Sequence, residues 1–285
     1  MRKSLLLLFL VLCFSTGSIF AQQSDYTDEE GRLLSKRGQV ILPAAGDFAL
    51  GLDARPLLNI FNFTAGNPPS AEMINQQIFL KYFTSDNMAF RVRVRLDQAI
   101  DTDRNRVILD NQQIPNPDIE VTDEWTDKST FVRIGGGMEV RKGKGRVVGV
   151  FGGEASFLYA KSSTEYDYGN PITEGNQSPT TTPGFGSVNG SRFERIVESQ
   201  AGKHLGFGVN GFAGVEYFIA PQISLGAEFT LGFDFTKNFR EERVYEFWDI
   251  ASGSRQTRSS VFEGGNEFSL GTGNYGGSIN LMFYF

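Results

Sequence analysis

The side chains most suited to a chemical role belong to three arginines at alternate positions, Arg91, Arg93 and Arg95, which are separated by apolar residues. In an extended strand this spacing places all three guanidinium groups on one face and the apolar residues on the other. Three cations in a row need anions opposite them. The candidates on the polar faces of other strands, with one further cation, are Arg133, Glu139, Glu216 and Glu228. The pattern predicts a packed network of ion pairs, and it leaves open a narrow polar channel or a proton path.

Eight segments show the period of two that is typical of a strand with one apolar and one polar face. Glycine is frequent, with 33 residues, and so is phenylalanine, with 26; this composition favours strands and turns over helices. The chain is therefore predicted to be all-β. The expected strands are Asp47–Ala54, Asn75–Thr84, Met88–Gln98, Thr130–Val140, Arg146–Lys161, Lys203–Phe218, Ile223–Phe235 and Glu267–Phe285.

The connections between these strands alternate between long and short. Short turns are expected at Ser85–Asn87, Lys142–Gly145 and Ile219–Gln222, whereas polar loops are expected at Ile100–Lys128, Ser162–Gly202 and about Lys237–Gly265. An up-and-down antiparallel barrel with both termini on one side produces this alternation. An even number of strands also lets the last strand pair with the first, so that no sheet edge is left open.

The beginning of the chain is typical of an exported protein. Residues 1–21 are predicted to be a signal peptide, with a basic start at Arg2 and Lys3 and an apolar core. The single cysteine, Cys13, lies within it, so we expect no disulfide in the mature chain. Residues 22–45 are predicted to be a mobile periplasmic leader with one short helix starting near Thr27; the alternative is a small plug or partner-binding arm. Residues 46–285 form the expected barrel.

The apolar rows indicate what surrounds this barrel. Leaving the row within Ile223–Phe235 in water would forfeit on the order of 10 kcal/mol, whereas lipid accommodates it. We therefore expect the rows to face lipid, the charges to face the lumen, and the protein to reside in the outer membrane of a Gram-negative cell. Short turns then lie in the periplasm and long loops outside the cell. The net charge of -6 argues against a nucleic-acid partner.

Catalysis and metal binding have little support. His204 is the only histidine, and its phase in Lys203–Phe218 places it at the inner face or the rim. A lipid-modifying enzyme of the outer membrane would use such a histidine with a serine and an acid, but we expect His204 to be a hydrogen-bonded rim residue. The mature chain lacks the cysteine, histidine or calcium-loop spacing of a metal site. No cofactor is expected.

The signal peptide, the alternation of connections and the C-terminal segment Ile279–Phe285 together resemble the small eight-stranded outer-membrane barrels of the OmpA-transmembrane and OmpX-like type. That resemblance implies that the terminal strand is the signal read by the barrel-assembly machinery. Its recognition positions would be Leu281, Phe283 and Phe285. Unlike the commonest members of that type, this protein is expected to have no peptidoglycan-binding domain after the barrel.

The sequence thus predicts a non-enzymatic outer-membrane barrel with a structural or loop-mediated role, as an accessory subunit of an assembly, secretion or uptake complex. A small pore and a lipid-modifying enzyme are the alternatives. The expected partners are outer-membrane lipid and lipopolysaccharide, the barrel-assembly machinery, and proteins bound through the extracellular loops or the leader.

Overall fold

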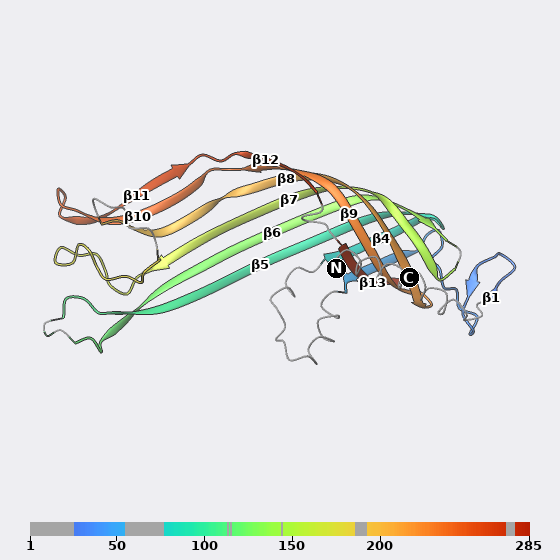
Figure 1. Ribbon diagram of the computed structural model, residues 1–285, viewed down its shortest axis with the longest axis horizontal. Coiled ribbons are helices and arrows are strands. Elements are labelled where there is room, and N and C mark those ends of the chain that lie inside the picture. Colours follow the sequence, from blue (N-terminus) through green and yellow to red (C-terminus); the bar gives the residue numbers. More distant parts are fainter. Residues whose placement is uncertain are drawn as a thin grey trace, which may run out of the picture.

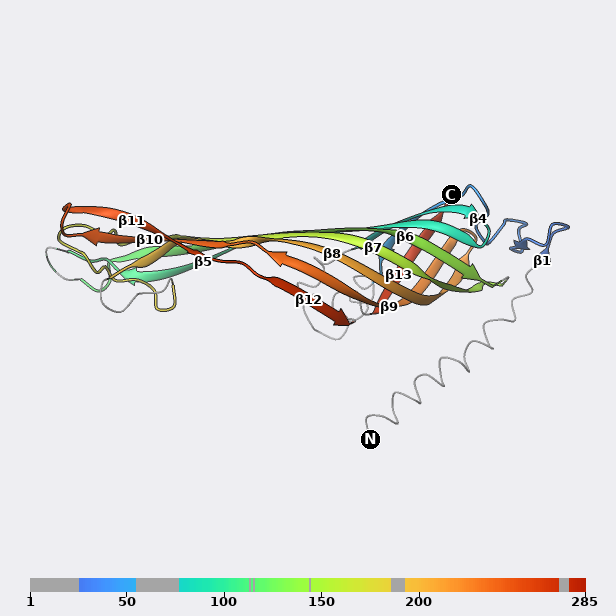
Figure 2. The ribbon, with the colours of Figure 1, turned by 90° about the horizontal axis from the view of Figure 1, so that it is seen from above.

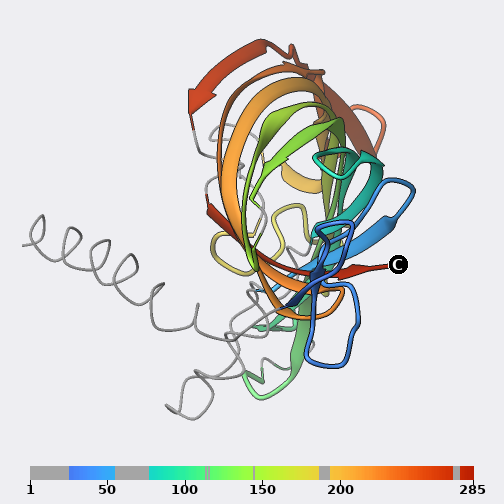
Figure 3. The ribbon, with the colours of Figure 1, turned by 90° about the vertical axis from the view of Figure 1, so that its right-hand side faces the viewer.

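Eight antiparallel strands close into a ring in the computed structural model, which describes residues 26–54, 77–112, 114, 116–143, 145–185, 193–271 and 277–285. β13 pairs with both β9 and β3 and closes the ring, seen end-on in Figure 3. The predicted eight-stranded up-and-down barrel is confirmed. Within the described residues, no helix is long and apolar enough to cross a membrane. The ring consists of β3 (Phe48–Asp53), β4 (Gln77–Ser85), β5 (Met88–Ile108), β6 (Glu120–Lys142), β7 (Val147–Asp167), β8 (Arg195–Ala220), β9 (Ile223–Asn238) and β13 (Gly277–Tyr284).

The closing strand joins the two ends of the barrel. Leu281 lies opposite Leu52 of β3 on one side and opposite Leu225 of β9 on the other, so the expected pairing of the last strand with the first is confirmed. The predicted single strand Glu267–Phe285 is instead divided between β12 (Asn266–Gly271) and β13, and both parts pair with β9. The part of the predicted strand between them lies outside the described residues.

Two of the three long polar segments, Ile100–Lys128 and about Lys237–Gly265, are strands for most of their length, and the prediction of loops is wrong there. In the described part of the third segment, Ser162–Gly202, strand covers only residues 162–167 and 195–202. β5 and β6 remain paired out to Ile108 and Glu120, far beyond the ring. β8 is extended in the same way and pairs with β10 (Glu241–Asp249), which in turn pairs with β11 (Ser254–Phe262). We call the resulting six-stranded sheet, in the order β5-β6-β7-β8-β10-β11, the outer sheet; it projects from one end of the barrel in Figures 1 and 2.

The outer sheet lacks apolar alternation because neither of its faces meets lipid: one face is open to water, and the other is partly covered by residues 168–185 through polar and aromatic contacts. In the barrel one face meets lipid and the other meets a packed interior, so side-chain polarity alternates with period two. Beyond the barrel the strand conformation is held by ladder hydrogen bonds to neighbouring strands, and these partners are distant in sequence. Sequence periodicity does not report such a strand.

An apolar band encircles the outside of the ring. On β5 it runs from Phe90 to Ile100, about 33 Å along the strand, which at a tilt of about 40° corresponds to about 25 Å of membrane thickness. A closed ring with such a band is the arrangement of an integral outer-membrane protein. We call the band the apolar belt; it includes Phe48, Leu50, Leu52, Ile78, Leu80, Phe90, Val92, Leu96, Ile134, Met138, Phe151, Phe157, Phe207, Val209, Val215, Leu225, Phe229, Leu231, Phe233 and Phe235, all exposed.

The leader folds against the periplasmic end of the barrel. β1 (Tyr26–Thr27) and β2 (Leu33–Leu34) form a short hairpin, and glycines at positive φ, Gly31 and Gly38, occupy the turns where a helix was predicted. Ile41 is completely buried and belongs to the apolar cluster that fills the end of the ring. Leu33 and Ile41 of this segment therefore pack on the end of the barrel, and the described part of the segment contains no helix. The predicted signal peptide lies outside the described residues.

Candidate functional site

The lumen is occupied by side chains that project inward from facing strands. Lys81 of β4 lies at the centre of one group, where its Nζ is 2.8 Å from Glu139 Oε2 of β6 and 2.6 Å from Glu216 Oε1 of β8. All three side chains are buried. A buried ammonium between two carboxylates compensates charge that would otherwise be costly to remove from water.

Arg91 forms the second group and crosses the barrel. Its Nη1 and Nη2 donate hydrogen bonds to the two carboxylate oxygens of Glu228, at 2.8 and 3.2 Å. Its guanidinium also lies 3.5 Å from both Glu139 and Glu154, and its Cζ is 3.9 Å from the centroid of the Phe212 ring. This bidentate, stacked geometry is specific to arginine and holds one rotamer.

Three further ion pairs extend the network along the barrel axis. Arg93 Nη2 is 2.6 Å from Glu154 Oε1, Arg133 Nη2 is 3.3 Å from Asp234 Oδ2, and Arg141 Nη2 is 2.9 Å from Glu216 Oε2. Among the described residues, five buried cations and five buried carboxylates make these contacts. We call this set the lumen network: Lys81, Arg91, Arg93, Arg133, Arg141, Glu139, Glu154, Glu216, Glu228 and Asp234.

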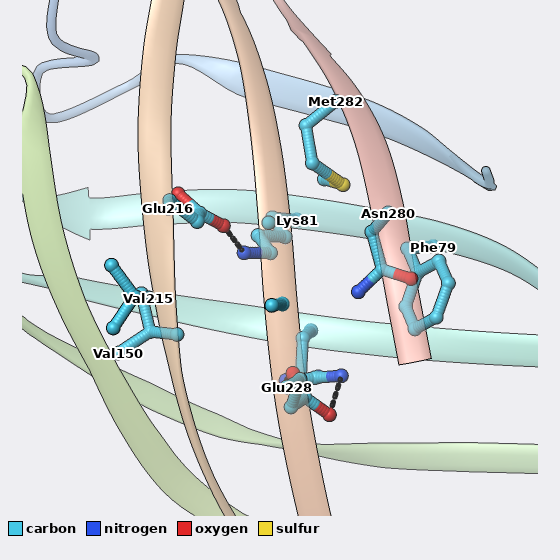
Figure 4. Close-up of a pocket in the computed structure, with 11 residues that line it drawn as sticks. Phe79, Lys81, Val150, Val215, Glu216, Glu228, Asn280 and Met282 are labelled. Carbon is cyan, nitrogen blue, oxygen red and sulfur yellow. Dashed lines mark hydrogen bonds and ion pairs between the residues drawn. The ribbon is translucent and has the colours of Figure 1, made fainter. Parts of the chain in front are cut away.

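The periplasmic end of the lumen is closed by aromatic residues. The Tyr284 ring contacts both Phe83 and Phe218, and its hydroxyl donates a 2.7 Å hydrogen bond to Glu216. Figure 4 shows the small cavity beside Lys81, which has a volume of about 10 Å³. A space of that size is at the lower limit for one water molecule.

Six of the seven charged residues predicted for the lumen lie in the network. The seventh, Arg95, lies opposite Arg133 in the β5–β6 ladder, and its Cζ packs 4.6 Å from the centroid of the Phe131 ring. Sequence reasoning missed Lys81, Arg141 and Glu154. Lys81 is flanked in its own row by Phe79 and Phe83, which point inward as well, so the row does not look polar. The six placed in the network are Arg91, Arg93, Arg133, Glu139, Glu216 and Glu228.

The remaining predicted positions lie at the two ends of the barrel. His204 Nδ1 is 2.6 Å from Asn238 Oδ1, where the ring passes into the outer sheet. At the opposite end Phe285 exchanges backbone hydrogen bonds with Phe48, at 2.8 and 3.0 Å, and its side chain is exposed. Leu281 and Phe283 lie on the same face of β13, half-buried between β9 and β3.

A second polar centre lies in the outer sheet, where the chain after β7 folds back. Asp123 is completely buried and accepts hydrogen bonds from the backbone of Gly169 at 3.0 Å and from the backbone and hydroxyl of Thr182 at 2.7 and 2.9 Å. Arg195 donates to the Asn170 carbonyl at 2.8 Å and to Glu246 at 2.6 Å. These contacts fix residues 168–185 against the face of the sheet that continues the lumen side.

Aromatic rings cover the same face. Phe185 meets the Trp125 ring edge-on at 5.5 Å between centroids, and Tyr166 stacks near Trp125 at 6.1 Å. Burial raises the pKa of Tyr168, whose hydroxyl donates to the Ile196 carbonyl. The rings form a small core between the outer sheet and residues 168–185.

Asp110 ties the end of the β5–β6 hairpin to the same segment. Partial burial raises the pKa of Asp110, but hydrogen bonds from Asn176 and from the backbone and hydroxyl of Thr180 outweigh this effect and lower the pKa overall. The ionised carboxylate is thus the form that holds the segment.

Two solved structures of outer-membrane proteins are similar to this chain. One is a major outer membrane protein from Thermus thermophilus, with a TM-score of 0.36, 14% identity, and coverage of 85% of this chain and 100% of that chain. The other is OprG from Pseudomonas aeruginosa, with a TM-score of 0.24, 8% identity, and coverage of 86% and 98%. No protein-family profile and no curated protein matches the chain. At such low scores neither likeness identifies a family, and the membrane assignment rests on the closed ring and its apolar belt.

Proposed function

We propose that this protein is a non-enzymatic accessory subunit whose filled barrel anchors the outer sheet, and that the outer sheet binds a strand of a partner protein at the cell surface. One observation supports the proposal above all. The same strands, β5 to β8, leave a lumen filled by ion pairs and continue into a sheet that carries no apolar belt on either face. The membrane part therefore serves as a support rather than as a passage.

The outer sheet offers two edges for strand addition. Among the described residues, β11 pairs only with β10, and the β4–β5 ladder ends at Arg95, so that β5 has no partner on that side from Leu96 to Ile108. Unpaired backbone N–H and C=O groups on such an edge can add a strand from another chain. Arg255 and Arg258 of β11 already form ion pairs with Glu246 and Glu194, so we expect the backbone groups of this edge, rather than its charge, to bind the partner strand.

The structure also suggests a clean deletion to test this proposal. The Asn238 N–H donates a 2.7 Å hydrogen bond to the Gly265 carbonyl, so β9 and β12 already face each other where β10 begins. Deleting residues 240–263 joins Phe239 to Gly264 and leaves a tight β9–β12 turn. The ring stays complete because β10 and β11 lie outside it.

The experiment compares the two proteins after extraction from the native membrane in mild detergent. We expect the full chain to migrate in a larger complex on a native gel and the deletion variant to migrate as a single barrel. Both should show the heat-dependent gel mobility of a folded barrel. Identical complexes from the two proteins would contradict binding through the β11 side.

The alternatives are tested on the same samples. A small pore would give stable conductance steps in a planar bilayer, and neutralising Arg93 would change them; we expect no steps from the full chain. A lipid-modifying enzyme would change the mass of lipid A in cells, and His204→Asn would abolish that change; we expect equal lipid A masses with and without the protein.

We further propose that the C-terminal strand is the signal for the barrel-assembly machinery. The Phe285 side chain is exposed at the periplasmic end, where a recognition factor can reach it. Deleting Phe285 should lower the yield of membrane-inserted barrel, whereas deletion of residues 240–263 should leave that yield unchanged. An undiminished yield without Phe285 would refute the signal while leaving the barrel itself untouched.

A further inference from the structure

Four neighbouring strands carry a lysine at the same place. On β6, β7, β8 and β9 the first charged residue that faces outward beyond the apolar belt is a lysine. On β9, for example, Lys237 follows Phe235 on the exposed face, and on β8 Lys203 follows Leu205. The four residues are Lys128, Lys161, Lys203 and Lys237.

The strand register places these lysines at one level of the barrel. Leu205 lies opposite both Tyr159 of β7 and Lys237 of β9, and the Phe239 N–H donates a 2.8 Å hydrogen bond to the Lys203 carbonyl. This level is the border between the apolar belt and the outer sheet. It is therefore the height of the lipid headgroups in the outer leaflet.

Three of the lysines are available to a ligand. Lys128 forms a 2.7 Å ion pair with Glu165. Lys161, Lys203 and Lys237 make no ion pair with any carboxylate of the described residues. The chain as a whole has a net charge of -6, so three adjacent ammonium groups without a carboxylate partner form a positively charged patch on a protein of opposite net charge.

A hollow at the same border adds a shaped site. It has a volume of about 390 Å³ and is lined by Lys237, Arg240, Asn238 and Asn266, with Glu263 as its one acid among the described lining residues. Two cations and two amides supply many hydrogen-bond donors, which suit the oxygens of a phosphate group. The lone carboxylate leaves the lining with a net positive charge.

The surface below the lysines is hollowed as well. At the middle of the belt on β7 and β8, Gly153 and Gly211 lie opposite each other and leave no side chain on the outer face. The depression there has a volume of about 540 Å³ and is flanked by Phe151, Phe229 and Leu231. An acyl chain fills such an apolar depression, so the face that carries the lysines also has room for lipid tails.

We infer that the outer face of β7, β8 and β9 is a binding site for a phosphorylated lipid of the outer leaflet. Lys161, Lys203, Lys237 and Arg240 bind its phosphate groups, and the depression at Gly211 receives an acyl chain. The site goes beyond partner binding by the outer sheet. It fixes the height and rotation of the barrel in the membrane and thereby the direction in which the outer sheet projects.

Native mass spectrometry of the full chain in detergent tests this site, with diphosphorylated lipid A, dephosphorylated lipid A and inorganic phosphate as separate probes. We expect diphosphorylated lipid A to bind at least tenfold more tightly than the dephosphorylated form. In the triple variant K161Q/K203Q/K237Q its affinity should fall to that of the dephosphorylated form. The matched control is K36Q/R37Q/K142Q, which removes the same charge at the periplasmic end and should bind like the wild type.

Three outcomes would overturn the inference. Equal affinity for the two lipids would remove the role of phosphate, and an unchanged triple variant would remove the role of the lysines. Binding of inorganic phosphate as tight as that of the lipid would remove the role of the acyl chain. Filling the depression with Gly211→Leu tests that last part separately, because it should weaken lipid binding while the heat-dependent gel mobility reports that the barrel is folded.

Discussion

Two ion pairs on the same strand differ in almost everything except distance. In the barrel, Arg91 of β5 and Glu228 lie 2.8 Å apart with side chains only 1% and 6% exposed. In the outer sheet, Arg104 of β5 and Glu124 lie 2.6 Å apart, with side chains 64% and 37% exposed. Burial rather than distance decides what such a pair does. A surface pair adds little to stability because water competes for both charges, whereas a buried pair must stay complete.

The comparison shows that loss of a charged side chain has different consequences in two parts of one strand. Inside the ring, each charge of the lumen network is paired with a neighbour, and removing one leaves another buried and uncompensated. In the outer sheet the exposed charges are solvated and replaceable, so the sequence there is free to suit a partner. The transition lies near Arg95, where the β4–β5 ladder ends.

The largest effect is expected from breaking the pair in the barrel. Arg91→Ala removes the cation that binds Glu228 and also contacts Glu139 and Glu154, and all three carboxylates are buried. We expect the free energy of unfolding to fall by about 3–5 kcal/mol. The measurement is the folded fraction as a function of urea concentration in lipid vesicles, read from heat-dependent gel mobility.

Arg104→Ala is the matched control in the outer sheet. It removes the same side chain from the same strand, and we expect a loss of about 0–1 kcal/mol. Equal losses from the two variants would show that burial does not separate the two regions.

A second test concerns the leader that caps the lumen. Ile41→Ala should cost about 2–4 kcal/mol of local stability, because Ile41 is completely buried against the aromatic end of the barrel. Limited proteolysis from the periplasmic side should then cleave within residues 26–45 faster than in the wild type. Substitution of the exposed Arg37 by alanine should leave the cleavage rate unchanged, and similar rates in both variants would contradict a docked leader.

A smaller and purely local effect is expected at Asp123. Asp123→Ala leaves the backbone N–H groups of Gly169 and Thr182 without their acceptor, at a cost of about 1–3 kcal/mol. Hydrogen exchange should become faster in residues 168–185 while the barrel strands keep their protection. Loss of protection throughout the barrel would show that the outer sheet and the barrel unfold together.

The smallest effect is a dependence on acidity at Asp110. The folded-state pKa of Asp110 lies below its ordinary value of 3.8, so its stabilising contribution is present above that value and is lost as pH falls through the lowered pKa. Exchange of the Thr180 amide, corrected for its intrinsic rate, should therefore become faster below about pH 4. In Asp110→Asn this exchange should be faster at neutral pH and should lose the additional acid dependence. The same acid dependence in that variant would assign it to another group.

The barrel could be predicted from the sequence because lipid favours apolar side chains and the lumen favours polar ones, so the polarity of successive residues in a strand alternates. Phe90 and Arg91, adjacent in the chain, end in lipid and in the lumen network, respectively. This contrast predicted the strand count, the strand order, the pairing of the last strand with the first, and the inward side of most residues in the lumen network. It failed at Lys81 because Phe79 and Phe83 share its row.

The tertiary structure alone decided the rest. Which carboxylate binds Arg91 depends on the closure of the ring, because Glu228 lies 137 residues away in the chain. Sequence periodicity did not reveal the outer sheet, because no contact with lipid imposes an alternation there. The sheet is held by ladder hydrogen bonds and by side-chain contacts between distant segments, such as Asp123 with Thr182. The docking of Ile41 is likewise decided by the shape of the barrel end. The difference between lipid and lumen appears in the sequence as an alternation of apolar and polar residues. Contacts between segments that are distant in the chain leave no such local pattern, and they form only when the chain folds.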